Sequence, residues 1–151
     1  MINQDEFFMN MALEQAKLAW EVYNEVPIGA VIVRNNQIIA AGSNLSLTNV
    51  DPTAHAEIIA IRKAAQSIGN YRLPAVDLYV TLEPCPMCFG AIMHARIKKL
   101  VYGAKDPKFG ALGSIVNLSN YKWNHKFTYQ GGILEQDCAG ILKEFFKQKR
   151  D

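Results

Sequence analysis

The apolar and polar positions along the chain divide it into helices and strands. Four segments carry the apolar periodicity or length of helices, namely residues 5–23, 54–68, 86–95 and 133–147. Four shorter runs rich in β-branched and other apolar residues predict strands, namely residues 30–34, 37–42, 77–82 and 97–103. Between residues 104 and 129 the pattern weakens, and the glycines, Pro107 and several asparagines there predict loops with short pieces of structure.

The order of these segments predicts how the strands pair. Asn35 and Asn36 tolerate positive φ, so we expect a hairpin between the first two strands. From Ala54 onward helix and strand alternate, which implies right-handed crossovers and parallel pairing of the later strands. The strand at 77–82 has no charge inside it, which indicates a central position. The pattern therefore predicts an α/β fold.

Helix boundaries are marked by specific residues. Gly69 and Asn70 end the second helix, as residues that adopt left-handed backbone do. Asp51 or Thr53 is expected to cap its start. We find no internal repeat, linker or low-complexity segment, so we expect one domain spanning residues 1–151.

Composition narrows the class of protein without identifying a partner. A chain of 151 residues is one ordinary domain, and its 16 basic and 14 acidic residues leave a net charge of +2, too small to argue nucleic-acid binding by itself. No apolar run is long enough for a membrane span, and the acidic residues near the N-terminus do not resemble a secretory signal. Three cysteines, two of them in a Cys-x-x-Cys turn, favour a reducing compartment and metal or redox use, so we expect a cytoplasmic protein.

The residues that carry chemistry gather around a Pro-Cys-Pro-Met-Cys turn at 84–88. Cys85 and Cys88 lie three apart at a helix start, where both thiols can converge on one ion, and His55 supplies a third soft ligand. No fourth ligand is evident, because Cys138 lies on an apolar helix face and the other two histidines are isolated. Three protein ligands indicate a catalytic Zn²⁺ with an open position rather than a structural one.

Glu57 adds a carboxylate next to these ligands. Residues two apart point in nearly opposite directions along a helix, so His55 and Glu57 can share a site only if the metal lies at the helix start. There the partial positive charge of the helix favours thiolates and developing anions. A zinc-bound water has a pKa near 7, and a neighbouring carboxylate can move its proton, so we assign Glu57 as the general acid and base of a hydrolytic deamination.

Each of these residues also has a simpler interpretation. A lone Cys-x-x-Cys turn is often a structural zinc knuckle or a redox pair, a lone histidine a core or cap residue, and a lone glutamate a solvated helix residue. Glu83, beside Pro84, is more often structural. The combination of His-Ala-Glu with a later Pro-Cys-x-x-Cys is far more specific and is an already known signature of zinc-dependent nucleobase deaminases.

Residues 51–57 and 78–88 resemble the cytidine deaminase superfamily. More closely, the chain is similar to bacterial tRNA-specific adenosine deaminases, with matching segments in order at 25–30, 70–73, 101–108, 113–114 and 124–125. The likeness runs from about Phe7 to Phe146. The chain departs from the family where residues 42–46 lack a tryptophan and an arginine, and where Phe109 replaces a small or polar residue.

The resemblance implies a three-layer α-β-α fold with a mixed five-stranded sheet and helices on both faces. It implies conversion of adenosine to inosine at wobble position 34 of a tRNA anticodon, typically in an arginine tRNA with the anticodon ACG, by a cytoplasmic homodimer. It implies one Zn²⁺ per chain on His55, Cys85 and Cys88, with Glu57 as the proton carrier. The matching substrate contacts are Asn44, Ala56, Asp106, Lys108 and Phe145.

Three functions remain open on the residues themselves. They are a tRNA adenosine deaminase, a deaminase of free guanine or a free pyrimidine nucleoside, and a zinc-stabilised binding module without catalysis. Glu57 argues against the binding module, because structural zinc needs no carboxylate that is not a ligand. Segments 106–108 and 113–114 favour the tRNA enzyme through the resemblance.

Overall fold

A computed structural model describes residues 3–150 of the chain. Its helices are α1 Gln4–Glu21, α2 Ala56–Ile68, α3 Pro86–Ala95 and α4 Glu135–Arg150, with a short 3-10 turn, η1, at Leu118–Asn120. Its strands are β1 Gly29–Arg34, β2 Gln37–Ser43, β3 Asp77–Leu82, β4 Lys99–Ala104 and β5 Thr128–Gln130. All eight elements predicted from the apolar pattern are present, with shifts of a few residues at their ends.

The strands form one mixed sheet in the order β2-β1-β3-β4-β5. β1 pairs antiparallel with both β2 and β3, whereas β3 with β4 and β4 with β5 are parallel. The predicted hairpin, the parallel pairing of the later strands and the central position of β3 are therefore confirmed. From β1 the chain continues to β2 on one side of the sheet, and from β3 it continues to β4 and β5 on the other, so the strand order switches between β1 and β3, the kind of place where open α/β sheets form their sites.

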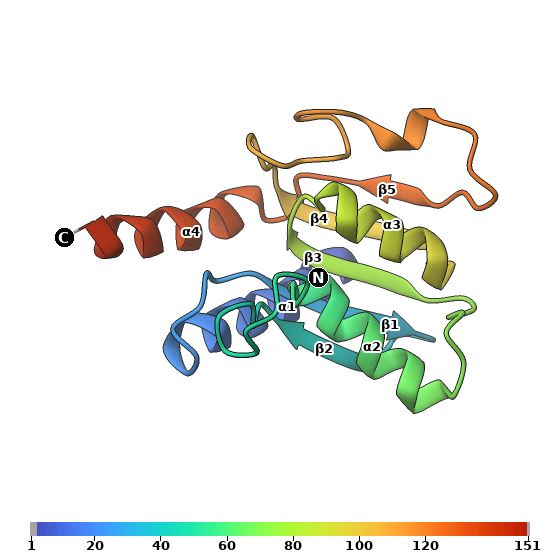
Figure 1. Ribbon diagram of the computed structural model, residues 1–151, viewed down its shortest axis with the longest axis horizontal. Coiled ribbons are helices and arrows are strands. Elements are labelled where there is room, and N and C mark those ends of the chain that lie inside the picture. The colour runs from blue at the N-terminus through green and yellow to red at the C-terminus, as the bar shows by residue number, and fades with distance from the viewer. Residues whose placement is uncertain (1–2, 151) are drawn as a thin grey trace.

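Helices cover both faces of the sheet, which confirms the three-layer architecture (Figure 1). One core packs α2 and α3 onto one face, with Ala60, Phe89 and Ile92 against Ile32, Leu78 and Leu100. The second core packs α1 and the start of α4 onto the other face, with Met9, Leu13 and Cys138 against Val31, Tyr79 and Val101. Burial of these apolar side chains, at roughly 25 cal/mol per Å², is the main source of stability.

A close helix–strand contact sets the position of α2. A Cβ atom on Gly42 of β2 would lie 2.5 Å from the carbonyl oxygen of Ala56 and 2.7 Å from the amide nitrogen of Ala60. Only glycine leaves room for the α2 backbone to approach the strand this closely. The contact brings the first turn of α2 onto the end of β2, which places His55 and Glu57 at the same end of the sheet as Cys85, the residue that follows β3 closely in the chain.

Two helix starts differ from the prediction. α2 begins at Ala56 and not at Ala54, and the cap position is taken by His55 rather than by Asp51 or Thr53. The Asp51 carboxylate instead accepts hydrogen bonds from the backbone and hydroxyl of Thr53 in the preceding turn. α4 begins at Glu135 and not at Ile133, because Leu134 has a φ of 54° and cannot continue a right-handed helix.

The region predicted to be loops contains β5 and η1 as its short pieces of structure. The apolar pattern did not locate β5, since its three residues are all exposed and too few to show a period. No helix among residues 3–150 is both long and apolar enough to span a bilayer.

Candidate active site

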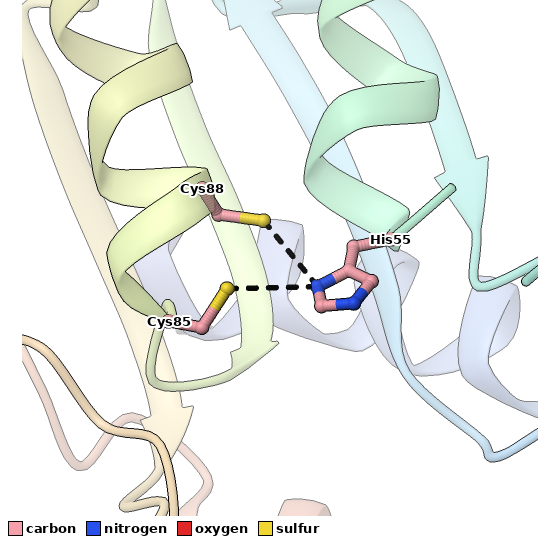
Figure 2. Close-up of side chains that lie close together, drawn as sticks. All are labelled: His55, Cys85 and Cys88. Atoms are coloured by element: carbon pink, nitrogen blue, oxygen red, sulfur yellow. Dashed lines mark hydrogen bonds between the residues drawn. The ribbon is translucent and has the colours of Figure 1, made fainter. Parts of the chain in front are cut away.

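The three predicted metal ligands converge on one point. The Nδ1 atom of His55 lies 3.7 Å from the Sγ atom of Cys85 and 3.6 Å from the Sγ atom of Cys88, as Figure 2 shows. All three ligand atoms lie within 4.8 Å of one another. At ordinary Zn–N and Zn–S bond lengths, two ligands of a tetrahedral zinc are about 3.6 Å apart. The donor types and spacings therefore fit Zn²⁺, and within residues 3–150 no other cluster of His, Cys, Asp or Glu does so.

Local backbone structure directs these side chains to one place. His55 and Cys85 are the residues just before α2 and α3, each with extended backbone and neither using its side chain to cap the helix. Pro86 at the first position of α3 needs no hydrogen-bond acceptor for its nitrogen. Two helix N-termini therefore point at the ligand cluster, as the spacing of His55 and Glu57 required, and their partial positive charge favours thiolate ligands.

Glu57 lies in the first turn of α2 and is only 4% exposed. Burial is the largest influence on its carboxyl group and raises its pKa to about 7. The neighbouring Cys85 thiolate acts in the same direction, whereas His55 opposes it. A carboxyl group of this pKa exists in both protonation states at neutral pH, which suits proton transfer.

The two thiols differ in environment. A hydrogen bond from Cys88 is the largest influence on Cys85 and, with the help of His55, lowers the pKa of the Cys85 thiol to about 4. The same hydrogen bond, together with burial, raises the pKa of Cys88. The lowered pKa of Cys85 favours the thiolate, the form in which a cysteine binds metal.

The cluster lies in an open cavity of about 940 Å³. His55, Glu57 and Cys85 line it, and other walls come from the loop after β2, the loop after β4 and one face of α4. The cavity is larger than one nucleobase needs, since about 300–1,000 Å³ accommodates whole drug-sized ligands. Its position beside the carboxyl ends of β3 and β4 agrees with the position of sites in open α/β sheets.

Three of the predicted substrate residues line this cavity, namely Asn44, Asp106 and Lys108. Asn44 is 7% exposed and is held by hydrogen bonds, donating from Nδ2 to the Val26 carbonyl and accepting at Oδ1 from Ser46. Ala56 is fully buried at the start of α2, and its side chain does not line the cavity.

Phe145, the remaining predicted substrate contact, is not among the residues that line the cavity. It is 4% exposed and packs edge-on against Trp20 of α1, which docks α4 onto the body of the protein. The neighbouring Phe146 lines the cavity and is 45% exposed. Successive helix residues point about 100° apart, so the two rings point in different directions from the same helix.

The predicted substrate contacts include no residue of the α4 face that lines the cavity. Its members share the spacing of one helix face and are Ala139, Leu142, Lys143, Phe146 and Arg150. This spacing can be read from the sequence. However, it overlaps the apolar stripe of the same helix, which predicts a face directed toward the core. Phe109, a departure from the family pattern, also lines the cavity and is 64% exposed.

Comparison with known proteins gives consistent matches. A family model described as MafB19-like deaminase matches residues 2–150. The tRNA-specific adenosine deaminase of Haemophilus influenzae is 51% identical over 97% of this chain and 86% of the relative. The Bacillus subtilis protein of the same name is 46% identical over 99% and 92%.

Solved structures give two levels of similarity. A structure from studies of A-to-I editing by tRNA:A34 deaminases at the wobble position of transfer RNA has a TM-score of 0.86 and 47% identity, covering 90% of this chain and 99% of the other. A guanine deaminase from Nitrosomonas europaea has a TM-score of 0.82 and 26% identity, covering 93% and 83%. The active-site motifs, the fold around them and the near full-length matches agree, and the chain belongs to the family of tRNA-specific adenosine deaminases.

Proposed function

We propose that this protein hydrolyses adenosine to inosine at wobble position 34 of a tRNA anticodon, with arginine tRNA carrying the anticodon ACG as the expected substrate. The observation that carries the proposal is the convergence of His55, Cys85 and Cys88 beside the buried Glu57 in one open cavity. The near full-length identity to proteins named tRNA-specific adenosine deaminase supports the choice of substrate.

We assign one Zn²⁺ per chain to His55, Cys85 and Cys88, whose donor atoms have the types and spacings that Zn²⁺ prefers. When bound, zinc would lower the pKa of water and so supply a nucleophile at neutral pH. In the net reaction water adds at C6 of adenine and ammonia leaves.

Glu57 is proposed as the proton carrier of this reaction. Its carboxyl group is buried beside the ligand cluster and lines the cavity, so it can exchange a proton with a water or a substrate held there. It would accept one proton of the attacking water and deliver it to the ring nitrogen, and it would then move the second proton, from the new hydroxyl group on C6, to the leaving nitrogen.

The cavity walls are proposed to hold the target base and its neighbours. A base must leave its stack to reach the ligand cluster, and Asn44 and the backbone of Ala56 would then hydrogen-bond its edge. Asp106 and Lys108 would contact adjacent nucleotides, with Phe146 taking the place predicted for Phe145. The exposed rings of Phe109 and Phe146 offer faces for stacking of unpaired bases, which is how proteins commonly bind RNA loops.

Positive charges around the cavity support an RNA substrate. Four basic side chains line it, namely Lys105, Lys108, Lys143 and Arg150. The net charge of the chain is only +2, but these four cations are concentrated at the cavity, where the phosphates of the RNA would lie.

Three further assignments belong to the same proposal. We assign residues 1–151 to a single deaminase domain, supported by a family match over residues 2–150 and by two cores that share one sheet. We also propose a homodimer and a cytoplasmic location, as the family resemblance implies.

The direct test uses a synthetic anticodon stem-loop with ACG as anticodon. Zinc-loaded protein should convert the adenosine at position 34 to inosine, detected by mass spectrometry of the digested RNA. A stem-loop with GCG in place of ACG serves as the control and should remain unchanged. Turnover of free guanine without turnover of the stem-loop would favour the alternative activity, for which the 26% identity to the guanine deaminase is the supporting observation.

A further inference from the structure

Two buried carboxylates outside the metal cluster lie against two different loops of the cavity, and one of them, Glu83, also lines it. Glu25 is 1% exposed and Glu83 is 2% exposed, which is unusual for ionisable side chains. The three ion pairs found among residues 3–150 involve other acids, so neither carboxylate has a cationic partner within that part of the chain. A buried carboxylate without a cation must be satisfied by hydrogen-bond donors.

Glu83 takes its hydrogen bonds from the loop that follows β4. Its carboxylate accepts from the backbone amides of Asp106 at 3.1 Å, Leu112 at 2.9 Å and Ser114 at 3.2 Å, and from the Ser114 hydroxyl. Gly110 completes the enclosure, because a Cβ atom there would lie 2.4 Å from the carboxyl carbon. The loop of residues 106–114 is therefore wrapped around one carboxylate.

This loop presents side chains to the cavity. The Asp106 carboxylate accepts from the amides of Lys108 at 3.0 Å and Phe109 at 3.2 Å, which fixes the turn between them. Both Lys108 and Phe109 line the cavity. A continuous chain of hydrogen bonds thus runs from Glu83 through Asp106 to the backbone of the two residues that face the substrate.

Glu25 has the same relation to the loop that follows β2. It accepts from the Thr48 amide at 2.6 Å, the Thr48 hydroxyl at 2.8 Å and the Leu47 amide at 3.2 Å. The turn it holds follows Asn44, whose side chain donates to the carbonyl of Val26, the residue next to Glu25, at 3.3 Å. The Asn44 side chain is therefore held on one side by the backbone next to Glu25 and on the other side by the turn that Glu25 anchors.

We propose that Glu25 and Glu83 are positioning residues, each of which holds one wall of the cavity in the shape that receives the nucleotides around the target base. Each acts through another residue: Glu25 through Asn44, and Glu83 through Lys108 and Phe109. The inference rests on the proposed function.

A carboxylate suits this role because its two oxygens accept several N–H groups at once, whereas an amide has a single acceptor oxygen. Neither loop forms a helix or a strand along its length, so loss of the anchor would remove several of the hydrogen bonds that order the loop before the substrate binds. When the carboxylate already orders the loop, substrate binding does not have to supply the free energy of ordering it.

The test compares Glu83→Gln and Glu25→Gln with the unaltered protein on the ACG stem-loop. Each variant should keep one zinc per chain and a kcat within about threefold, while KM rises between about tenfold and a hundredfold because a binding wall is displaced. Amide hydrogen exchange should become faster in residues 106–114 for Glu83→Gln and in residues 46–49 for Glu25→Gln, with the strands unchanged. Glu6→Gln, an exposed acid on α1, is the matched control and should alter none of these quantities.

Milder variants keep the test valid if a buried glutamine prevents folding. Ser114→Ala and Thr48→Ala each remove one hydroxyl donor from a carboxylate, and each should raise KM by a smaller factor with the same local pattern of exchange. Combining Ser114→Ala with Glu83→Gln should raise KM by less than the product of the single effects, because both act in one network. Combining Glu83→Gln with Glu25→Gln should give close to that product.

Two results would overturn the inference. The first is an unchanged KM in both variants while wild-type protein produces inosine normally, which would leave the proposed function intact. The second is faster exchange across the whole sheet together with loss of zinc, which would give the carboxylates a general structural role. Absence of inosine with wild-type protein would overturn the proposed function itself, and with it the assignment of these walls to RNA.

Discussion

The floor of the cavity and its α4 wall are built in different ways. The floor consists of the first turns of α2 and α3, two helices packed on the sheet, and its residues His55, Glu57 and Cys85 all lie near those helix starts. α4 contacts the sheet near its beginning, where Cys138 is buried, and docks on α1 through Phe145. Figure 1 shows the rest of α4 extending beyond the sheet.

This difference in packing matches a difference in role: the floor carries the chemistry, and the α4 wall takes part in recognising the substrate. The ligand atoms must stay within a few tenths of an ångström of their positions, which demands the rigid packing of a core. A wall that meets a flexible RNA loop tolerates adjustment, and a helix with few anchoring contacts supplies it. Substitutions in the floor should therefore affect kcat and metal content, whereas substitutions in the α4 wall should affect KM.

The largest effect is expected from removing a floor ligand. Cys88→Ala should lose zinc and all measurable inosine formation, and should also lower the melting temperature because metal binding contributes to folding. Metal analysis and thermal unfolding check this. Cys138→Ala is the matched control: the residue is equally buried but belongs to the second core and not to the ligand cluster, so the variant should keep zinc and lose only about 1 kcal/mol of stability. Full zinc content in Cys88→Ala would remove that residue from the ligand set.

The next effect comes from the floor carboxylate. Glu57→Gln keeps the size of the side chain but cannot accept a proton, so kcat should fall by between about a hundredfold and ten-thousandfold with zinc retained. Single-turnover assays with zinc-loaded protein measure this loss apart from RNA binding. Turnover close to that of the unaltered protein would exclude Glu57 as the proton carrier.

A neighbouring pair on α4 sharpens the comparison. Phe145→Ala removes the ring that docks α4 on Trp20 and should lower the free energy of unfolding by about 3 kcal/mol. Phe146→Ala should leave stability nearly unchanged and raise KM for the stem-loop by about fivefold to tenfold, as loss of one stacking face does. Chemical denaturation and steady-state kinetics on both variants separate the two roles. Loss of stability in Phe146→Ala together with a raised KM in Phe145→Ala would mean that α4 is rotated from the orientation described.

The smallest effect is expected at a single cation of the cavity. Lys108→Ala should weaken RNA binding modestly and reduce the slope of log affinity against log salt by about 0.7, the value for one contact with a single strand. Binding measured across a salt series gives this slope. Lys17→Ala, an exposed residue paired with Glu14 on α1, should leave the slope unchanged.

Local sequence patterns predicted the fold well where the signal repeats over several residues. Apolar periodicity and length located four helices, apolar runs located four strands, and the two-residue turn at Asn35 and Asn36 predicted the hairpin that the structure contains. β5 escaped because three exposed residues paired to β4 carry no period of their own. The capping role expected of Asp51 failed because that side chain is occupied within its own turn.

The sequence by itself determined which residues carry the chemistry of the floor, because that information lies within short stretches of the chain. The spacing of Cys85 and Cys88, and of His55 and Glu57, is read within a single turn, and the requirement that both pairs lie at helix starts follows from helix geometry. Only the tertiary structure decided how His55 and Cys85, thirty residues apart, come within 3.7 Å, because packing of α2 on Gly42 places them. Tertiary structure also decided that Phe146 rather than Phe145 faces the cavity, and that Glu25 and Glu83 hold its loops, because the rotation of a helix and the partner of a buried charge depend on contacts distant in sequence.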